Sequence, residues 1–204
     1  MNKGAFIIMT LFFTLATFVS GAQALTPEQV DTAKVYRSLE KALQHPDRVY
    51  RLDLTRQKLK EVPKEVFLLP YLHELILDRN KIEVIPQDIN KLSYLQHLSI
   101  TRNELTEVPN EICALTKLRV LNLGENYIEE LPQDMDRMVE LRELILWSNM
   151  LGELPFSLVL LEHLEHIDLL HNEMNAEEQR VIRDMLPNSR IELSTPCICN
   201  FDDD

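Results

Sequence analysis

Glycine and cysteine are scarce in this chain. Only 4 of its 204 residues are glycine and 45% are hydrophobic, which excludes a collagen-like chain and a disordered one. Three cysteines are too few to staple a domain of this length with disulfides, so buried apolar side chains must hold the core. Basic residues are also in deficit, with 21 Lys and Arg against 33 Asp and Glu and a net charge of −12. This deficit disfavours binding to nucleic acid or to an anionic membrane, because both need clustered positive charge.

The first residues carry the pattern of a targeting segment. An uncharged apolar run occupies residues 5–19, and the small residues Ala22 and Ala24 follow it. This pattern predicts a secretory signal peptide over residues 1–24, cut before Leu25. An uncleaved anchor is the alternative, since the run could nearly span a bilayer, but its threonines and the lack of a basic stop-transfer cluster disfavour it. We therefore expect a secreted or periplasmic protein with no stable membrane insertion after signal cleavage.

Two kinds of residue recur every 23 positions. The asparagines of the repeat are Asn80, Asn103, Asn126, Asn149 and Asn172. The prolines of the repeat are Pro63, Pro86, Pro109, Pro132 and Pro155. Around each asparagine the frame L-x-x-L-x-L-x-x-N-x-L returns, and Gln57 stands one period before the first asparagine. Such self-similarity indicates a repeat architecture, in which stacked coils bury one continuous core.

The frame also predicts the local structure of each coil. Alternation of leucine with variable residues is typical of a short strand whose leucines point inward. One asparagine per coil would cap backbone groups of the neighbouring coil. After each proline, apolar residues return at every third position, which favours a 3₁₀ or extended arc, and the proline fixes φ at the bend.

Over residues 49–194 the chain resembles the leucine-rich repeat family in its typical 23-residue class. The resemblance implies an α/β fold, a leucine-rich repeat solenoid or horseshoe with a parallel concave sheet, 3₁₀ or irregular convex arcs, and helical caps at both ends. We expect six coils over residues 48–174. Extracellular animal and plant relatives usually carry cysteine clusters in both caps, and the N-terminal cap here has none. The resemblance is therefore to short secreted bacterial members.

The ends of such a stack need caps, because the terminal coils would otherwise expose their leucines. Residues 25–47 predict an N-terminal cap helix that starts at a capping box formed by Thr26 and Gln29 and has one apolar face. The residues of that face are Val30, Ala33, Tyr36, Leu39 and Leu43.

Residues 175–195 predict the C-terminal cap, a helix that begins at a second capping box and is followed by an edge strand with Ile191 and Leu193. The helix residues expected to face the last coil are Val181, Ile182, Met185 and Leu186. Residues 196–204 form an acidic Cys-x-Cys tail. Its Cys197 and Cys199 could form a strained disulfide, capture a metal or bridge to another molecule.

Function must come from the strand residues that face out of the concave sheet, because the leucines build the scaffold. Reading these positions in register places four residues in one apolar patch: Val120, Ile145, Trp147 and Leu170. Trp147 is the only tryptophan, and exposed apolar patches that contain tryptophan are typical of binding sites. The patch therefore predicts a protein ligand on the concave face. The alternative is that Ile145 and Trp147 only pack on each other, since strands favour both residue types.

A column of arginines, Arg56, Arg79 and Arg102, directly precedes the asparagine position in the first three coils. Guanidinium groups stacked about 5 Å apart repel each other, so the column needs compensating charge. The carboxylates expected to supply it are Asp53, Asp78 and Glu74. The column then forms a solvated charge network; the alternative is a dock for a carboxylate, an acidic loop or an anionic glycan.

The remaining reactive residues give weaker signals. His163, His166 and His171 lie before, within and after the last strand of the repeat, a spacing that disfavours a metal site. We expect surface imidazoles there and neither metal nor cofactor. Cys113 occupies a convex position that varies between coils, which predicts a free, partly covered thiol out of reach of Cys197.

Taken together, these patterns predict a monomeric, non-catalytic protein-binding module that is exported from the cytoplasm. Its concave face would bind the protein ligand with the apolar patch as anchor and the arginine column as rim. The chain is not expected to be an enzyme, because it has no glycine-rich phosphate loop, nucleophile elbow or Cys-His pairing. One alternative is a self-associating envelope component that uses its edge strand near Ile191. A less favoured alternative is an enzyme or metal-binding protein that uses the C-terminal Cys and His residues.

Overall fold

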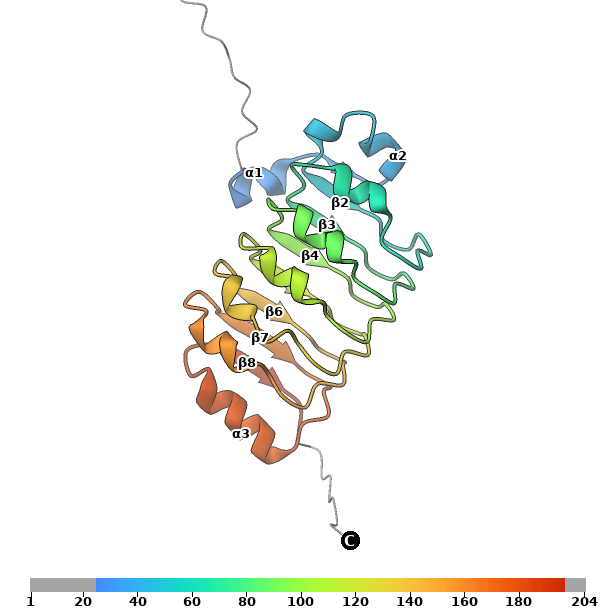
Figure 1. Cartoon of the computed structure of the whole chain (residues 1–204). Coiled ribbons are helices and arrows are strands. Elements are labelled where there is room, and N and C mark those ends of the chain that lie inside the picture. The colour runs from blue at the N-terminus through green and yellow to red at the C-terminus, as the bar shows by residue number, and fades with distance from the viewer. Residues whose placement is uncertain (1–24, 197–204) are drawn as a thin grey trace, which may run out of the picture.

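The protein is an open solenoid built on one sheet of eight parallel strands, which pair in sequence order (Figure 1). The computed structural model describes residues 25–196, so the predicted signal peptide and the pair Cys197 and Cys199 lie outside the described residues. The strands are β1 (Val35–Tyr36), β2 (Arg51–Asp53), β3 (Glu74–Ile76), β4 (His97–Ser99), β5 (Val120–Asn122), β6 (Glu143–Ile145), β7 (His166–Leu169) and β8 (Arg190–Leu193). The predicted fold class, with its parallel sheet, is confirmed.

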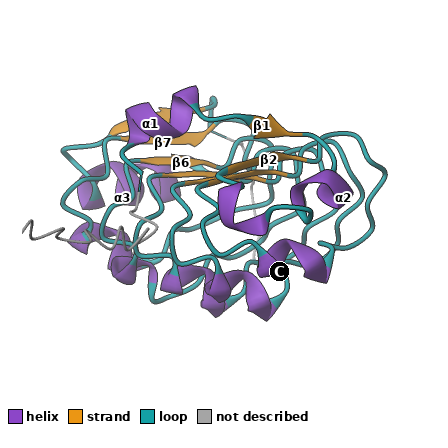
Figure 2. Ribbon diagram, turned by 90° about the horizontal axis from the view of Figure 1, so that it is seen from above, coloured by secondary structure: helices purple, strands orange, loops and turns teal. Residues whose placement is uncertain are grey.

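Short 3₁₀ helices form the opposite side of the solenoid, as Figure 2 shows from above. They are η2 (Lys64–Leu68), η3 (Gln87–Lys91), η4 (Asn110–Ala114), η5 (Met135–Arg137) and η6 (Phe156–Leu160). The repeat prolines start most of these arcs. Pro63, for example, has φ −60° at the N-cap of η2, and its carbonyl accepts a hydrogen bond from the Val66 N–H at 3.0 Å. The predicted 3₁₀ arcs are confirmed. They start after the prolines because proline fixes φ where the chain bends.

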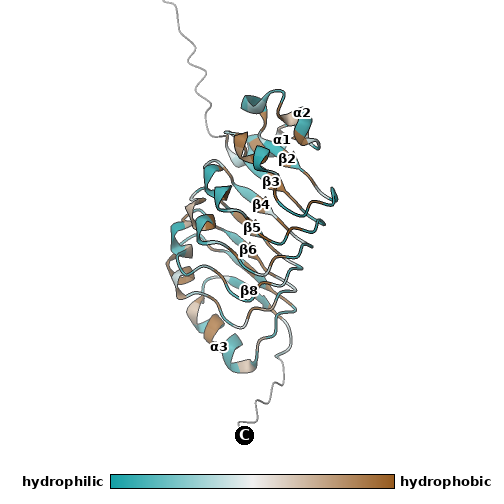
Figure 3. Ribbon diagram, turned by 45° about the vertical axis from the view of Figure 1, so that its right-hand side comes forward, coloured by the Kyte–Doolittle hydropathy of each residue, from teal (hydrophilic) through white to brown (hydrophobic). Residues whose placement is uncertain are grey.

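The inward leucines of neighbouring strands stack into one continuous core. Leu75, Leu98, Leu121 and Leu144 are register partners on successive strands, and each has 0% relative exposure. Burial of each such side chain contributes about 1.5–3 kcal/mol. Figure 3 shows hydrophobic and hydrophilic residues alternating along the coils. Since every coil contributes to the same cluster, the stack is stabilised as a unit.

The asparagine ladder connects neighbouring coils through their backbones. Asn103 has 6% relative exposure, and its Oδ1 accepts a hydrogen bond from the Ile82 N–H of the previous coil at 3.0 Å. Its Nδ2 donates to the Leu77 carbonyl of the previous coil and to the Thr101 carbonyl of its own coil, both at 3.1 Å. The predicted capping role is confirmed. Gln57, at the same position one coil before the ladder, is exposed and donates from Nε2 to a carbonyl of the N-terminal cap at 3.1 Å.

The N-terminal cap differs from the prediction of one continuous helix. It comprises α1 (Pro27–Thr32), the edge strand β1, α2 (Leu39–Ala42) and a short 3₁₀ turn, η1 (Pro46–Arg48). The capping box of Thr26 and Gln29 is present at α1. The single-helix prediction was wrong because Val35 and Tyr36 pair with β2 and cover its free edge. A β-branched and an aromatic residue favour this strand, and Ser38 then caps a new helix.

The C-terminal cap agrees with the prediction except on one face. Helix α3 (Ala176–Met185) begins at the predicted capping box of Asn175 and Glu178, and β8 pairs with β7 as the predicted edge strand. Val181, however, is 52% exposed, whereas Gln179 has 2% exposure and donates to the Ser194 carbonyl at 3.1 Å. Gln179 and Ile182 lie three positions apart and share the buried face of the helix. Val181 lies about a third of a turn from Ile182 and therefore points away from the last coil. No helix within residues 25–196 is long and apolar enough to cross a membrane.

Candidate protein-binding face

The strand register lines the variable residues up in columns on the concave face. The first column consists of Arg51, Glu74, His97, Val120, Glu143, His166 and Arg190, each paired with the next on adjacent strands. These are the residues that the repeat frame placed in one column, so the predicted register is confirmed. Side chains in a column are lateral neighbours because parallel strands lie about 4.8 Å apart.

A compact apolar group occupies the C-terminal half of this face. Ile145, Trp147 and Leu170 are half-buried, and we call them the concave patch. The carbonyl of Leu170 accepts a hydrogen bond from the Ser148 N–H at 2.7 Å, which places Leu170 beside Trp147 on the next coil. The inward positions on either side of Ile145 are filled by other residues, so none of the three is needed to fill the core.

The indole of Trp147 lies against the backbone of Gly124 on the preceding coil. A Cβ at Gly124 would lie 2.3 Å from Trp147 Nε1 and 2.7 Å from its Cδ1, distances that no side chain can occupy. Glycine is therefore required here by the close approach of the ring. The two coils are also joined by a hydrogen bond from the Glu125 N–H to the Trp147 carbonyl at 2.8 Å. Gly124 is a residue of the candidate face that the sequence analysis missed; the signal was a glycine in a column where other coils carry side chains.

Val120, the fourth predicted member of the patch, lies in a different setting. Its register partners are His97 on β4 and Glu143 on β6. With Arg119 and Arg142 it lines a cleft of about 240 Å³ between α1 and the sheet. The structure thus places Val120 among charged side chains rather than beside Trp147.

The arginine column stands on an unusual backbone. Arg56, Arg79 and Arg102 have φ of 59°, 56° and 56°, in the left-handed region that favours glycine. The same position is left-handed in the following three coils, at Glu125, Ser148 and His171. Each such residue costs about 1–2 kcal/mol relative to the right-handed region. This conformation could not be predicted from the sequence, because neither glycine nor asparagine occupies the position.

The compensating charges predicted for the arginine column are engaged elsewhere. Asp53 forms an ion pair with Arg37 of the cap, with Oδ2 3.5 Å from Nε. Glu74 binds Arg51 at 2.9 Å. Asp78 accepts hydrogen bonds from the Ser99 hydroxyl at 2.7 Å and the Thr101 N–H at 2.9 Å. The prediction that these three carboxylates serve the column was wrong, because each has a partner nearer in the fold.

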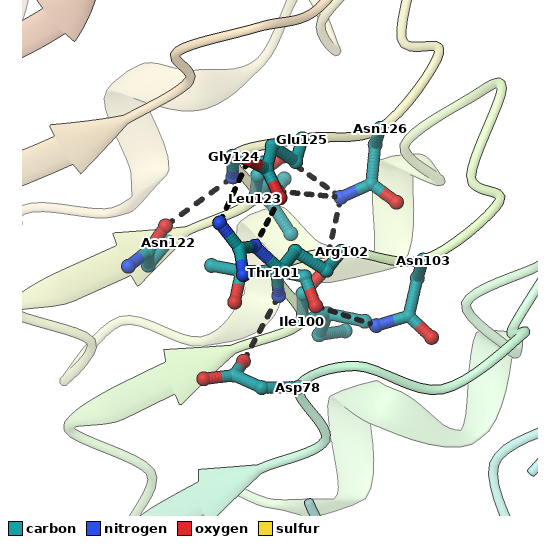
Figure 4. A network of polar contacts seen from close by, with 10 residues as sticks. All are labelled: Asp78, Ile100, Thr101, Arg102, Asn103, Asn122, Leu123, Gly124, Glu125 and Asn126. Carbon is teal, nitrogen blue, oxygen red and sulfur yellow. Dashed lines mark hydrogen bonds and ion pairs between the residues drawn. The ribbon is translucent and has the colours of Figure 1, made fainter. Parts of the chain in front are cut away.

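Of the three arginines, Arg102 alone has a carboxylate partner in the described residues. That partner is Glu125, which occupies the same position in the next coil. Arg102 Nη2 donates to Glu125 Oε1 at 3.0 Å, and Figure 4 shows the pair beside Asn103 and Gly124. Within residues 25–196 no carboxylate forms an ion pair with Arg56 or Arg79, and both side chains are exposed. The free guanidinium groups on this rim are therefore those of Arg56 and Arg79.

The histidines and the described cysteine differ in exposure. His166 Nε2 lies 3.3 Å from Glu192 Oε1, and His171 is exposed, with its N–H bonded to the Ser194 hydroxyl at 2.7 Å. No group of three metal-ligating side chains occurs in the described part of the chain. Cys113 is free but has 0% exposure, so the prediction of a partly covered thiol was wrong. Burial, with a smaller effect of Asp134, raises its pKa to about 11 and keeps the thiol protonated.

Comparison with known proteins identifies the family. The family model of the leucine-rich repeat matches residues 47–105 and 93–151, which together make up half of the chain. The chain belongs to the leucine-rich repeat family. Members of this family are generally non-catalytic binding modules, so the assignment indicates a protein-interaction module. A search of the curated proteins gives no match.

Among solved structures, 414 chains match, so the fold by itself does not select a ligand. One of them is a leucine-rich repeat protein of Leptospira interrogans, 34% identical with a TM-score of 0.65. The match covers 80% of this chain and 49% of that protein, so this leucine-rich repeat chain spans about half the length of its relative.

Proposed function

We propose that this leucine-rich repeat protein is an exported, non-catalytic module that binds a protein ligand on its concave face. The observation that carries the proposal is the position of Trp147, whose indole lies against Gly124 at a distance that leaves no room for a side chain there. An aromatic residue that is already ordered before binding loses little conformational entropy in a complex. Tryptophan is also prominent among residues that dominate interface energies.

The charged rim supports a partner with accessible carboxylates. Arg56 and Arg79 are exposed on the coils N-terminal to the concave patch, without an ion-pair partner in the described residues. Bidentate arginine–carboxylate pairs are among the stronger polar contacts, and they fix orientation. A ligand that buries an apolar segment against Trp147 and extends toward β2 and β3 would meet both features.

The binding proposal is tested by capture from envelope and culture fluid, followed by titration of the captured protein. The variant is the double substitution Trp147→Glu and Ile145→Asp. The matched control is Phe156→Glu on the convex side, because Phe156 is 75% exposed and apolar. Wild type and control should retain a partner that the double variant loses. Equal capture by all three folded proteins would contradict the proposal.

The export proposal rests on the apolar segment ahead of Leu25 and has a separate test. Cell fractionation and the intact mass of the recovered protein give its compartment and its first residue. We expect an exported form that begins at Leu25. Recovery of the uncut chain from the cytoplasm would contradict export without affecting the binding test.

Self-association is a second candidate, favoured by one observation. Strand β8 pairs with β7 on one side, and its other edge has no strand partner within residues 25–196. Free edges can pair with another chain. Light scattering across a concentration series distinguishes the two candidates, since an oligomer that Ile191→Pro abolishes would favour self-assembly.

A further inference from the structure

His73 is a buried histidine at the start of β3. Its side chain has 1% relative exposure and lies between two aromatic rings, with centroids 5.7 Å from Tyr50 and 5.8 Å from Tyr94. Its Nδ1 is 2.6 Å from the Tyr71 carbonyl. A carbonyl can only accept a hydrogen bond, so Nδ1 carries the proton and Nε2 is left as an acceptor. The structure thus presents one oriented acceptor nitrogen at the N-terminal end of β3, an interior strand of the sheet.

Leu25 supplies the donor for this nitrogen. Its backbone N–H donates to His73 Nε2 at 3.0 Å, and its carbonyl accepts a hydrogen bond from Gln96 Nε2 at 2.8 Å. His73 and Gln96, which lie 48 and 71 positions away in the sequence, thus bind both backbone groups of Leu25. Leu25 is also the first residue after the cut that Ala22 and Ala24 predict. The residue that the sequence pattern places directly after the cut is thus one whose backbone N–H and carbonyl are both bound.

Beyond Leu25, the chain lies across the concave side of the sheet as α1. Figure 2 shows α1 on the side opposite to the 3₁₀ helices. Val30 has 4% exposure, and Arg51 Nη1 donates to the Asp31 carbonyl at 2.6 Å. With Val30 and Asp31, α1 forms one wall of the 240 Å³ cleft whose other wall includes Val120.

We infer that His73 and Gln96 form a binding site for the chain's own α-amino terminus, and that this site holds α1 over the concave face as a strap that acid releases. The inference rests on the proposed export and on cleavage before Leu25. Cleavage converts the Leu25 amide into a primary ammonium group at the same atom. The hydrogen bond to the neutral imidazole then becomes charge-assisted, and such bonds are about twice as strong as neutral ones.

Protonation of His73 would break this contact. A proton on Nε2 removes the acceptor and places two cations together. Burial, the largest effect, lowers the pKa of His73; the Tyr71 carbonyl raises it and Lys117 lowers it. The ring faces Tyr50, Tyr71 and Tyr94, and Lys117 lies with Nζ 4.1 Å from the Tyr94 ring.

The carboxylates of the neighbouring elements do not offset the protonated ring. Glu74, next in the chain, is held by Arg51, and α1 carries Glu28 and Asp31 as exposed residues. Because Nε2 accepts the Leu25 hydrogen bond in the docked state and is free to take up a proton when α1 leaves, the undocked state binds more protons as the pH falls. The strap is therefore stable near neutral pH and weakens progressively in acid.

The experiment uses the processed protein recovered from the exported fraction. Its intact mass first establishes the N-terminal residue. Hydrogen exchange of residues 26–33, corrected for intrinsic rates, is then measured at about pH 7.5 and about pH 5. We expect protection to fall about tenfold or more at the lower pH, while protection of β5 stays unchanged.

Three variants isolate the contact. His73→Gln keeps an acceptor near the position of Nε2 but does not titrate, so protection of α1 should become independent of pH. His73→Phe has no acceptor and should leave α1 unprotected at both pH values. One alanine added before Leu25 moves the ammonium away, and protection at neutral pH should fall about threefold.

Several results would overturn the strap. They are a mature chain that begins elsewhere, equal protection in wild type and His73→Phe, the same pH dependence in His73→Gln as in wild type, or no effect of the added alanine. Ligand binding at Trp147 does not involve Leu25 or His73. A failed strap with intact binding is therefore distinguishable from a failed binding proposal.

Discussion

The two halves of the concave face share one backbone register but differ in chemistry. Around β3, Glu74 has 4% exposure and is held by Arg51, with His97 Nδ1 3.9 Å from the same carboxylate. Around β6, Glu143 stands in the same column but is exposed, and the neighbouring outward positions carry the apolar concave patch. The leucines and asparagines fix where each side chain stands in both halves. The outward positions are consequently free to differ, and under the proposed function a ligand would bury its apolar part against the C-terminal half.

The largest effect is expected from a substitution in the asparagine ladder, which both halves of the concave face share. Asn103→Ala leaves the buried Ile82 N–H without a partner and removes the hydrogen bonds from Asn103 to the Leu77 and Thr101 carbonyls, although Asn80 still binds the Leu77 carbonyl. An unsatisfied buried group costs about 1–3 kcal/mol and each further hydrogen bond lost costs about 1 kcal/mol, so we expect a loss of about 3–4 kcal/mol in the free energy of unfolding. Urea denaturation measures this loss. Gln57→Ala, at the exposed equivalent position one coil before the ladder, should cost less than about 0.5 kcal/mol. Equal losses would show that the ladder does not hold the coils together.

The second effect is confined to the N-terminal half. Glu74→Leu leaves Arg51 without its carboxylate, in a pair whose side chains are only 19% and 6% exposed. We expect a loss of about 2–4 kcal/mol, because an uncompensated charge is left partly buried. The exposed pair of Lys91 and Asp88 is the control, and Asp88→Asn should change stability by less than about 0.5 kcal/mol. Thermal unfolding at low and high salt checks both, and a Glu74→Leu loss that salt abolishes would contradict the account.

The third effect is confined to the C-terminal half. Gly124→Ala places a methyl group where the indole lies, so the Trp147 ring must move. We expect a loss of about 1–3 kcal/mol and a shift in the emission of the single tryptophan. Gly152→Ala is the matched control, since a Cβ there meets nothing within 4 Å. Identical emission spectra for the two variants would show that Gly124 does not position the ring.

The smallest effect concerns the left-handed arginines. Arg79→Gly removes the side chain from a position with φ 56° and has no ion pair to lose within the described residues. Relief of the backbone outweighs the added freedom of the unfolded chain by a few tenths to about 1 kcal/mol, so unfolding should shift upward. Arg102→Gly has the same backbone gain but loses Glu125, and should gain less. A net loss on Arg79→Gly would mean that its side chain makes a stabilising contact.

The repeated parts of the molecule could be predicted from the sequence. The spacing of Leu75 and Leu98, repeated in every coil, determines the register, and the buried asparagines determine where the coils are joined. Both signals are strong because each is repeated five times or more along the chain. The α3 capping box could likewise be predicted, because its two residues, Asn175 and Glu178, lie only three positions apart.

The features that the sequence did not reveal depend on contacts between coils. Tyr36 fits the predicted helical face, but with Val35 it forms a strand because β2 offers a free edge. The role of Gly124 depends on a ring 23 residues away, and that of His73 on Leu25, 48 residues away. Asp53 and Asp78 could not be assigned either, since their partners come from the cap and from the next strand.

The central claim is that the concave patch binds a protein ligand, and the direct measurement is the dissociation constant of the captured partner. Titrations compare wild type, Trp147→Glu and the convex control Phe156→Glu, each with unchanged unfolding. Loss of a dominant interface residue costs about 2 kcal/mol or more, so Trp147→Glu should weaken binding about 30-fold or more and Phe156→Glu should leave it unchanged. Equal affinities for wild type and Trp147→Glu, or a larger loss in Phe156→Glu, would contradict the account.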